Sequence, residues 1–448
     1  MVESRAFSAP GKALLVGGYL VLEPKYVSYV VALSSRMHAI VTVDPTCNSN
    51  NDGFEVTVQS SQFNDEKWVY LIDGSNNYAS QELYGSQNKF IEKVLFNVLN
   101  LCSPDISKTP DLAVEIFSDA AYHSQVGSIV KQNKFKEFCF HKKGIADVPK
   151  TGLGSSAGLV TVLTASLLSF FQPSFNAQST QGLNLVHKIA QVAHCQAQGK
   201  VGSGFDVAAA TFGSALYQRF EPALINDLPA ADDPNYQLAL KNLVNKVEWG
   251  YRAEPVSLPK GLRIVMGDVN SGSETTKLVA KVNTWYKENL PRSLDIYKTI
   301  DTYNRAFIEG ISDLELLSQK NLEEYTTLLK ALNSRNAPDS FPAINKVRDA
   351  VEGIRRNFRI ITEESGADIE PYVQTKLLDN SLKLDGVLTG MVPGAGGYDA
   401  IALVTTESSE LPIQTKNNPN FASVTWLNLH QESMGILEEN PSHYIDLV

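Results

Sequence analysis

The nine residues Lys150-Thr-Gly-Leu-Gly-Ser-Ser-Ala-Gly158 are the most informative stretch of this 448-residue chain. Glycine tolerates positive φ angles and lets the backbone pass close to a ligand, so successive N–H groups can point at anionic oxygens. The run that follows, Leu159 to Phe171, is long, largely apolar and free of Gly and Pro. It predicts a buried helix whose positive N-terminus faces the ligand. We therefore interpret the stretch as a phosphate-binding loop that leads into a helix.

Two common phosphate-binding patterns do not describe this loop. The P-loop string G-x-x-x-x-G-K-[ST] occurs nowhere in the chain. Gly152, Gly154 and Gly158 form G-x-G-x-x-x-G, which is one residue longer than the dinucleotide-binding fingerprint. Taken alone, the loop is equally compatible with an ordinary helix start that uses serine caps and a tight turn. The choice between these interpretations depends on the rest of the chain.

Composition and charge exclude several classes of function. The chain is 43% hydrophobic and 20% charged, as is typical of soluble globular proteins, and its length allows two or three domains. Its 39 basic and 49 acidic residues give a formal net charge of −10, which argues against a broad nucleic-acid or membrane-binding surface. We expect small-molecule substrates, no nucleic-acid or membrane partner, and a monomer or weak dimer.

Cysteine usage and hydropathy bear on the cellular compartment. Cys47, Cys102, Cys139 and Cys195 are far apart and form no C-x-x-C pair, so neither a zinc site nor a disulfide framework is expected. The apolar run after Lys12 is interrupted by two glycines and lacks a cleavage site, and no run approaches the roughly 18 apolar residues of a spanning helix. These features predict a cytoplasmic protein.

Short β-like runs at 26–33 and 39–43 predict an antiparallel or mixed sheet in the first part of the chain, with polar surface excursions at 45–54 and 120–147. The Pro- and Asp-rich segment 221–235 is the best candidate for a domain boundary. Beyond it, strands are expected at 262–266, 386–389 and 400–405, with a helix at 273–288 and several helices within 293–364 and 370–383. We predict an α+β fold with domains at 1–222 and 223–448.

Three further motifs carry chemistry. Pro10 and Gly11 predict a turn just before Lys12, which could neutralise a phosphate but could equally be a solvated hairpin lysine. Asp206 follows the glycine-rich string Gly199-Lys-Val-Gly-Ser-Gly204, and is either a helix N-cap or a general base in a dry pocket. The string Pro393-Gly-Ala-Gly-Gly-Tyr-Asp399 permits a second close approach of backbone to ligand, or forms a plain turn.

These four segments, in this order, resemble the GHMP kinases, the superfamily of galactokinase, homoserine kinase and mevalonate kinase. The resemblance covers nearly the whole chain and rests on Pro10-Gly11-Lys12, on Gly152 to Ala157 and on Gly394 to Gly397. It implies a two-domain fold, with an N-terminal domain like ribosomal protein S5 domain 2 and a C-terminal ferredoxin-like α/β sandwich.

Finer strings at 193–210, 365–371 and 393–400 resemble the fungal-type phosphomevalonate kinases of that superfamily. This resemblance implies transfer of the ATP γ-phosphoryl group to the phosphate of (R)-5-phosphomevalonate in isoprenoid and sterol synthesis. The alternatives are mevalonate kinase, another small-molecule GHMP kinase, or a catalytically idle ATP-binding sensor. Retention of Lys12 and Asp206 counts against the sensor.

The resemblance also implies roles for individual residues, with Lys12 and Asp206 catalytic and the Ser156 hydroxyl a ligand of Mg²⁺. The residues expected to bind the phosphates of ATP are Lys150, Gly152, Leu153, Gly154, Ser155, Ser156 and Ala157. Those expected to bind the acceptor are Lys12, Ser155, Asp206, Ser273, Thr275, Lys277 and Gly396.

One departure from the superfamily pattern concerns the metal. Mevalonate kinase and its relatives carry a glutamate ahead of the aspartate motif that helps to hold the metal, whereas Gln191 to Phe205 contains no carboxylate. This absence counts against mevalonate kinase. His194 lies in the same stretch, and we interpret it as a structural histidine in preference to a metal or substrate ligand.

Overall fold

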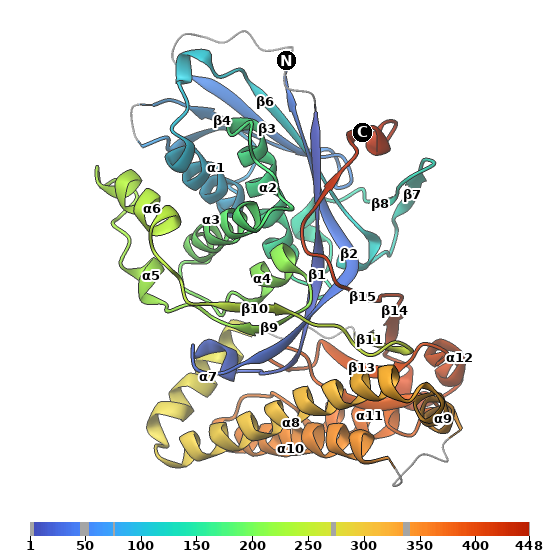
Figure 1. Ribbon diagram of the computed structural model, residues 1–448. Coiled ribbons are helices and arrows are strands. Elements are labelled where there is room, and N and C mark those ends of the chain that lie inside the picture. Colours follow the sequence, from blue (N-terminus) through green and yellow to red (C-terminus); the bar gives the residue numbers. More distant parts are fainter. Residues whose placement is uncertain (1–3, 45–52, 75–76, 270–274, 335–340, 448) are drawn as a thin grey trace.

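The computed structural model of the chain describes residues 4–44, 53–74, 77–269, 275–334 and 341–447. It has a large sheet built mainly from the first half of the chain and a smaller sheet from the second half, each covered by helices (Figure 1). Figure 1 also shows the long strands β1 and β2 running from the larger unit toward the smaller one. The architecture confirms the expected α+β class.

The large sheet has the strand order β10-β9-β2-β6-β3-β4-β5, with β1 and β15 also paired to β2 and β16 paired to β1. Pairing is antiparallel throughout the described strands except between β3 and β6, so the sheet is mixed. Its strands are β1 (Arg5–Val16), β2 (Ser28–Val43), β3 (Phe54–Ser60), β4 (Glu66–Ile72), β5 (Ser80–Tyr84), β6 (Leu112–Ser118), β9 (Ala215–Gln218), β10 (Arg252–Pro255), β15 (Gln431–Glu432) and β16 (Leu437–Glu439). A separate hairpin, β7 (Ile129–Gln132) and β8 (Glu137–Phe140), lies in the expected excursion at 120–147.

The runs at 26–33 and 39–43 form one continuous strand, β2, and not two. Most of the polar residues between them have partners in the protein: the Arg36 Nε donates to Ser8 Oγ at 2.8 Å, and His38 Nδ1 lies 2.9 Å from the Tyr444 hydroxyl. A few polar residues between two apolar runs therefore do not reliably mark the end of a strand, because their side chains can form hydrogen bonds inside the protein.

The helices of the first unit lie on one side of the large sheet, some against its strands and others against neighbouring helices (Figure 1). They are α1 (Lys89–Cys102), α2 (Ser155–Phe171), α3 (Thr180–Gln198), α4 (Phe205–Phe212), α5 (Ala223–Asn226) and α6 (Tyr236–Asn245). Helix α2 is buried from Ala157 to Ser169 and contacts α1, α3, β1 and β2, as expected for a helix that is apolar on all sides. It begins at Ser155, so the serines of the loop belong to its first turn.

The second unit is a four-stranded antiparallel sheet with the order β12-β13-β11-β14. Its strands are β11 (Leu262–Asp268), β12 (Val387–Met391), β13 (Ala400–Thr406) and β14 (Thr425–Leu427). Its helices are α7 (Thr275–Glu288), α8 (Arg292–Lys320), α9 (Leu322–Asn333), α10 (Pro342–Ser365), α11 (Tyr372–Ser381) and α12 (Leu411–Thr415). Helices α8 and α10 lie side by side across this unit (Figure 1). No helix among the described residues is long and apolar enough to span a bilayer.

The division of the chain into domains at 222/223 stays a prediction. Strands from both the beginning and the end of residues 223–448 pair with the large sheet of the first unit. Strand β10 pairs with β9 and therefore continues the large sheet to Pro255. Strands β15 and β16 return from the second unit to pair with β2 and β1. The C-terminal segment consequently belongs to the first sheet, although it is far from it in sequence.

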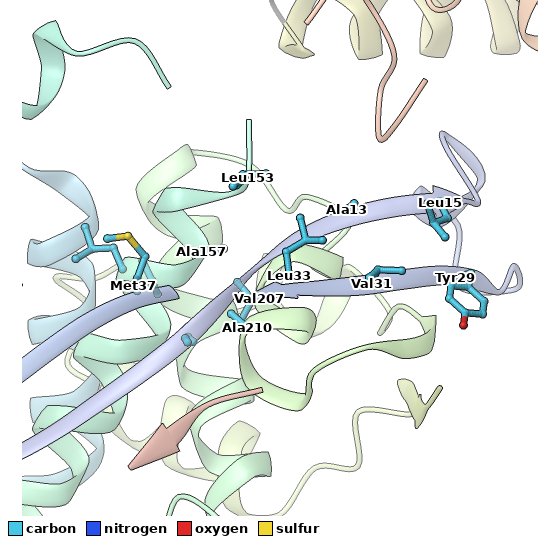
Figure 2. Packing of buried hydrophobic residues seen from close by; sticks show 14 of the residues in the cluster. Ala13, Leu15, Tyr29, Val31, Leu33, Met37, Leu153, Ala157, Val207 and Ala210 are labelled. Carbon is cyan, nitrogen blue, oxygen red and sulfur yellow. The ribbon is translucent and has the colours of Figure 1, made fainter. Parts of the chain in front are cut away.

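The loop of residues 150–158, called the phosphate loop below, packs against the main hydrophobic core. Figure 2 shows Leu153 and Ala157 near Met37 of β2, with Val207 and Ala210 of α4 nearby. Gly158 lets α2 approach β2, because a Cβ at that position would lie 2.6 Å from the Met37 Cγ. Close packing therefore sets the position of the first turn of α2 relative to β1 and β2.

Candidate active site

A cleft of about 380 Å³ lies where the motifs of the two halves of the chain converge. Its walls come from β1, the loop before α2, the end of α3 with the loop that follows, the start of α7 and the loop between β12 and β13. The four segments singled out in the sequence thus meet at one place. Residues of the cleft used below are Lys12, Gly152, Gly154, Gln191, His194, Gln198, Lys200, Asp206, Thr275, Gly394, Ala395 and Gly396.

The phosphate loop has the backbone that its glycines predict. Gly152 and Gly154 have φ angles of 77° and 86°, in the left-handed region that favours glycine. Gly154 is the N-cap of α2, and no side chain caps this helix end. Within the described part of the chain, the first N–H groups of α2 therefore have no side-chain acceptor, and together with the helix dipole they form a site suited to phosphate.

Lys12 lies within β1, so the turn predicted at Pro10 and Gly11 is wrong. The strand continues through these residues with a shift of register, in which Pro10 faces Arg36 and Gly11 faces Leu33. Proline has no N–H for a ladder bond, and such an irregularity accommodates it without ending the strand.

The Lys12 side chain is held against the phosphate loop. Its backbone N–H donates to Leu153 O at 3.1 Å, and its Nζ donates to Gly152 O at 2.8 Å. Burial lowers the pKa of Lys12, and the nearby carboxylate of Asp206 opposes this shift. The Nζ also lies 5.6 Å from the centre of the Phe205 ring. Lys12 is thus a cation fixed beside the site where phosphate oxygens would bind.

Asp206 lies in the first turn of α4, and Gly204 is the N-cap residue of this helix. Of the two alternatives left open by the sequence, the N-cap is therefore wrong. The Asp206 Oδ1 accepts from the backbone N–H of Val207 at 2.9 Å, while Oδ2 lies 4.0 Å from His194 Nε2. With 23% of its side chain exposed, Asp206 is open to the cleft.

His194 lies between the first turn of α2 and Asp206, and its burial is compatible with the interpretation as a structural histidine. Its side chain is only 4% exposed, and its Nε2 lies 3.1 Å from Ser156 Oγ and 3.3 Å from Gln198 Nε2. The available sequence signal was that the stretch around His194 contains no carboxylate. In the structure, the polar group of this stretch that faces Ser156 is His194.

Gln191 is a residue that sequence reasoning missed. Its Nε2 donates to Gly204 O at 2.7 Å, and a Cβ at Gly204 would lie 2.7 Å from the same amide. This contact fixes the turn that precedes Asp206. A glutamine within a helical pattern carries no sequence signature for such a role, so only the packing of α3 against this turn identifies it.

The loop between β12 and β13 brings the second unit to the cleft. Gly394 N donates to Leu14 O at 3.3 Å, and the Tyr19 hydroxyl donates to Ala395 O at 2.7 Å. Gly396 has a φ of 72°, and a Cβ there would lie 2.2 Å from Ile369 O. No other residue fits this close approach of two backbone segments.

The remaining predicted residues divide into three groups. Leu153 and Ala157 are buried, so they could contact a nucleotide only through their backbone, and Ser155 and Ser156 are partly buried at the start of α2. Lys150 and Lys277 are exposed and do not line the cleft, and their binding roles stay predictions. Ser273 lies outside the described residues. Lys200, which sequence reasoning did not select, lines the cleft together with Lys12 and Thr275.

The donors at this site fit Mg²⁺ only if substrate oxygens complete its coordination. Mg²⁺ prefers oxygen ligands and is usually bound by one or two protein groups together with phosphates and water. The described residues include no group of three His, Cys, Asp or Glu side chains that could hold a metal ion. The carboxylates of Asp206 and Asp399 line the cleft. Ser156 is partly buried at the start of α2, next to the lining residue Gly154, and its hydroxyl lies 3.1 Å from His194 Nε2.

Comparisons with known proteins show the family of the chain. The family profile described as GHMP kinases N terminal domain matches residues 125–214. The chain is 42% identical to phosphomevalonate kinase of Candida albicans, covering 99% of this chain and 100% of that protein. It is 33% identical to phosphomevalonate kinase of Aspergillus fumigatus, and that match covers 92% of this chain and 89% of the fungal protein.

A solved structure shares the fold. Phosphomevalonate kinase of Streptococcus pneumoniae, in complex with phosphomevalonate and AMPPNP, matches with a TM-score of 0.56 at 16% identity. The match covers 96% of this chain and 100% of the bacterial one. At this identity the likeness concerns the fold alone.

Proposed function

The chain belongs to the phosphomevalonate kinases of the GHMP kinase superfamily, and from this premise we propose how its cleft carries out the reaction. The enzyme transfers the γ-phosphoryl group of ATP to the phosphate of (R)-5-phosphomevalonate and releases ADP and (R)-5-diphosphomevalonate. The observation that carries the proposal is the convergence of Lys12, the uncapped start of α2 and Asp206 on one cleft.

The nucleotide phosphates bind at the start of α2. The N–H groups of its first turn and the left-handed glycines Gly152 and Gly154 provide donors at close range, and the helix dipole favours the negative charge. Mg²⁺, when bound, neutralises charge on the β- and γ-phosphates. In this proposal Ser156 is its protein ligand and phosphate oxygens and water supply the remainder.

The transfer step depends on position and charge. An oxygen of the acceptor phosphate forms a bond to the γ-phosphorus, while the bond from that phosphorus to the β,γ-bridging oxygen breaks and ADP leaves with the electron pair. The transition state is loose, with charge spread over the transferred group. Lys12 stands beside the phosphate loop, bound to Gly152 O, and its Nζ can stabilise this charge without first having to be ordered.

Asp206 has a lesser role as a base than it would have toward a hydroxyl acceptor. A phosphate monoester has a second pKa near ~6, so at neutral pH it has already lost the proton that a base would remove. We assign Asp206 to orientation: its carboxylate attracts Lys12 and can accept a hydrogen bond from a hydroxyl of the acceptor. A position directly against the acceptor phosphate would be disfavoured by like charge.

The acceptor carries a carboxylate and a phosphate, so it needs cations in a protein of net charge −10. Lys12 and Lys200 line the cleft together with Asp206, whereas Lys150 and Lys277 do not line it. We therefore propose Lys200 as the second cation for the acceptor, with Thr275 and Gly396 contributing polar backbone or hydroxyl contacts from the other side of the cleft.

The assay that tests this function compares acceptors. The purified protein is incubated with ATP, with or without Mg²⁺, and with phosphomevalonate or mevalonate, and ADP release is followed in a coupled assay. We expect ADP release that requires both Mg²⁺ and phosphomevalonate, with little turnover of mevalonate. Equal turnover of mevalonate, or turnover of neither compound, would overturn the assignment.

We also propose that the enzyme works in the cytoplasm as a monomer or weak dimer. Cys102, Cys139 and Cys195 are free thiols, which is usual for a reducing compartment. Fractionation of cells that express the tagged chain tests the location, and light scattering of the purified protein tests the oligomeric state.

A further inference from the structure

His194 is a polar group of the cleft to which the proposed mechanism gives no task. It lies near the end of α3, and its ring is almost completely buried, with 4% of the side chain exposed. The ring packs near Phe90 at a centroid distance of 5.7 Å. Its Nε2 nevertheless points at polar neighbours: Ser156 Oγ at 3.1 Å, Gln198 Nε2 at 3.3 Å and Asp206 Oδ2 at 4.0 Å.

The neighbours of Nε2 determine which hydrogen-bonding role it plays. The amide nitrogen of Gln198 can only donate, so we assign the lone pair of the neutral imidazole to Nε2 and the ring proton to Nδ1. Nε2 has a single lone pair, and Ser156 Oγ, the nearer of the two groups at 3.1 Å, takes the larger share of it by donating its hydroxyl proton. Asp206 Oδ2 is too far away, at 4.0 Å, for a hydrogen bond to this nitrogen.

This donation orients the Ser156 hydroxyl. A serine hydroxyl has one proton and two lone pairs, and only a lone pair can bind a cation or accept a hydrogen bond. With the proton directed at His194, both lone pairs are available to the start of α2, where the phosphates bind. Without an acceptor at position 194, the hydroxyl rotates freely and its proton can point toward the cation.

We propose that His194 is a positioning residue that holds the Ser156 hydroxyl with its lone pairs toward the metal–nucleotide complex. The inference rests on the proposed function for the presence of ATP and Mg²⁺ but not on the identity of the acceptor. The segment 191–205 contains no carboxylate that could be a second charged ligand of the metal. In this proposal the segment supplies His194 Nε2 as a hydrogen-bond acceptor for Ser156 in its place.

The test measures nucleotide binding by calorimetry, with AMPPNP titrated into the protein either with excess Mg²⁺ or in EDTA. For His194→Leu, which keeps an apolar contact with Phe90, we expect the Kd of Mg·AMPPNP to rise about 10-fold, a usual loss when the support of a metal ligand is removed. The Kd in EDTA should stay within about 2-fold of the wild type, because the backbone donors of α2 are unchanged. His194→Gln, whose amide oxygen can accept from Ser156, should restore the Kd of Mg·AMPPNP to within about 3-fold of the wild-type value.

Two further variants separate this role from a structural one. Ser156→Ala removes the group on which His194 acts, so adding His194→Leu to it should not raise the Kd of Mg·AMPPNP further. His187→Leu is the matched control, because His187 lies on the same helix, is 0% exposed and packs against Phe212 and Tyr251. We expect this control to change thermal stability but not the Mg²⁺ dependence of binding.

The proposal is overturned if His194→Leu weakens AMPPNP equally with Mg²⁺ and in EDTA, if His194→Gln fails to restore binding, or if the effects of Ser156→Ala and His194→Leu add. None of these results depends on phosphomevalonate. A wild-type protein that bound Mg·AMPPNP but released no ADP with phosphomevalonate would contradict the proposed function and leave the role of His194 standing.

Discussion

Lys12 combines three properties that rarely occur together in one lysine. It lies within a strand, its Nζ is bound to a backbone carbonyl of the phosphate loop, and burial lowers its pKa. A surface lysine has none of these constraints and loses side-chain entropy when it binds a ligand. The protein has already ordered Lys12, so in the proposed mechanism its charge is available where the transferred group gains negative charge.

The first prediction concerns the size of this contribution. We expect Lys12→Ala to lower kcat by at least ~100-fold, the scale observed when one preorganised group that stabilises transition-state charge is removed. Steady-state kinetics with phosphomevalonate and MgATP provide the measurement. Lys108→Ala is the matched control, since Lys108 pairs only with Asp105 on the surface, and its side chain is 81% exposed. Wild-type kcat in Lys12→Ala would show that this charge is dispensable.

The second prediction concerns pH. The proposed mechanism requires Lys12 in its charged form, and its pKa in the folded protein is lower than that of an ordinary lysine. As pH rises through this lowered pKa the charge is lost, so kcat should fall on the alkaline side, at a pH below the ~10.4 of a free lysine. In Lys12→Arg the alkaline limb should move beyond the accessible range, because arginine stays charged. Identical alkaline limbs in the wild type and Lys12→Arg would assign the limb to another group.

The residues that sequence reasoning found and those it missed differ in a physical way. Lys12 and Asp206 lie in glycine-containing strings that mark close approach of the backbone to a ligand, and the cleft brings both together. Gln191 and His194 lie inside a regular amphipathic helix, where a polar residue looks the same whether it faces solvent or a neighbouring loop. Lys200 is exposed and close to glycines, but only the folded chain shows that it faces the cleft.

At the scale of single elements, the loop before α2 is where local sequence and tertiary structure agree most closely. Gly154 adopts a left-handed conformation, and a Cβ at this position would lie 3.0 Å from the Lys12 Cε. The glycine therefore serves two purposes: it allows the turn into α2, and it leaves space for the side chain of Lys12.

The third prediction separates these purposes. Gly154→Ala should destabilise the protein by about 1 kcal/mol or more, because alanine is strained at positive φ, and should also displace Lys12 and lower kcat at least about 10-fold. Gly127→Ala is the matched control: Gly127 has a φ of 77°, and a Cβ there would meet no atom within 4 Å. We expect it to lose similar stability in denaturant titrations while keeping its kcat. Equal losses of kcat in both variants would show that backbone strain alone is responsible.

Regular elements with strong periodicity could be predicted, and irregular ones could not. The apolar helix after the loop and strands β11 and β13 lie where their patterns place them. The apolar periodicity of residues 183–198 likewise predicts a helix, and α3 begins three residues earlier, at Thr180. The continuous strand β2 and the irregularity in β1 at Pro10 and Gly11 depend on partners far away in sequence, such as Ser8 for Arg36. Local patterns carry no information on such partners, and for this reason a turn and a strand break were predicted where the chain stays extended.

At the scale of the whole molecule, the cleft exists because the two units are joined across it. The Tyr19 hydroxyl donates to Ala395 O, Gly394 N donates to Leu14 O, and the Tyr19 ring packs edge-on against Phe358 at 6.2 Å. These contacts link the end of β1 to the glycine-rich loop of the second unit. Strand order and the return of β15 and β16 to the large sheet likewise could not be read from the sequence.

The fourth prediction tests this connection. Tyr19→Phe keeps the contact with Phe358 but removes the hydrogen bond to Ala395, so we expect it to lower the free energy of unfolding by about 1 kcal/mol. Because Ala395 lines the cleft, the KM values should rise as well. In Tyr29→Phe, which removes a buried hydroxyl that has no hydrogen-bond partner among the described residues, stability should be unchanged or higher. Comparable losses in both variants would contradict a specific role for the Tyr19–Ala395 bond.

The central claim is that this cleft uses a phosphate group, and not a hydroxyl, as the acceptor. Phosphorus NMR of a reaction with MgATP and (R)-5-phosphomevalonate tests it most directly, because the two acceptor groups give different products. We predict that the monoester signal of the substrate is replaced by the two coupled signals of a diphosphate as ADP forms. A second monoester signal without phosphorus–phosphorus coupling in the product, or ADP formation with no change in the substrate signal, would contradict the claim.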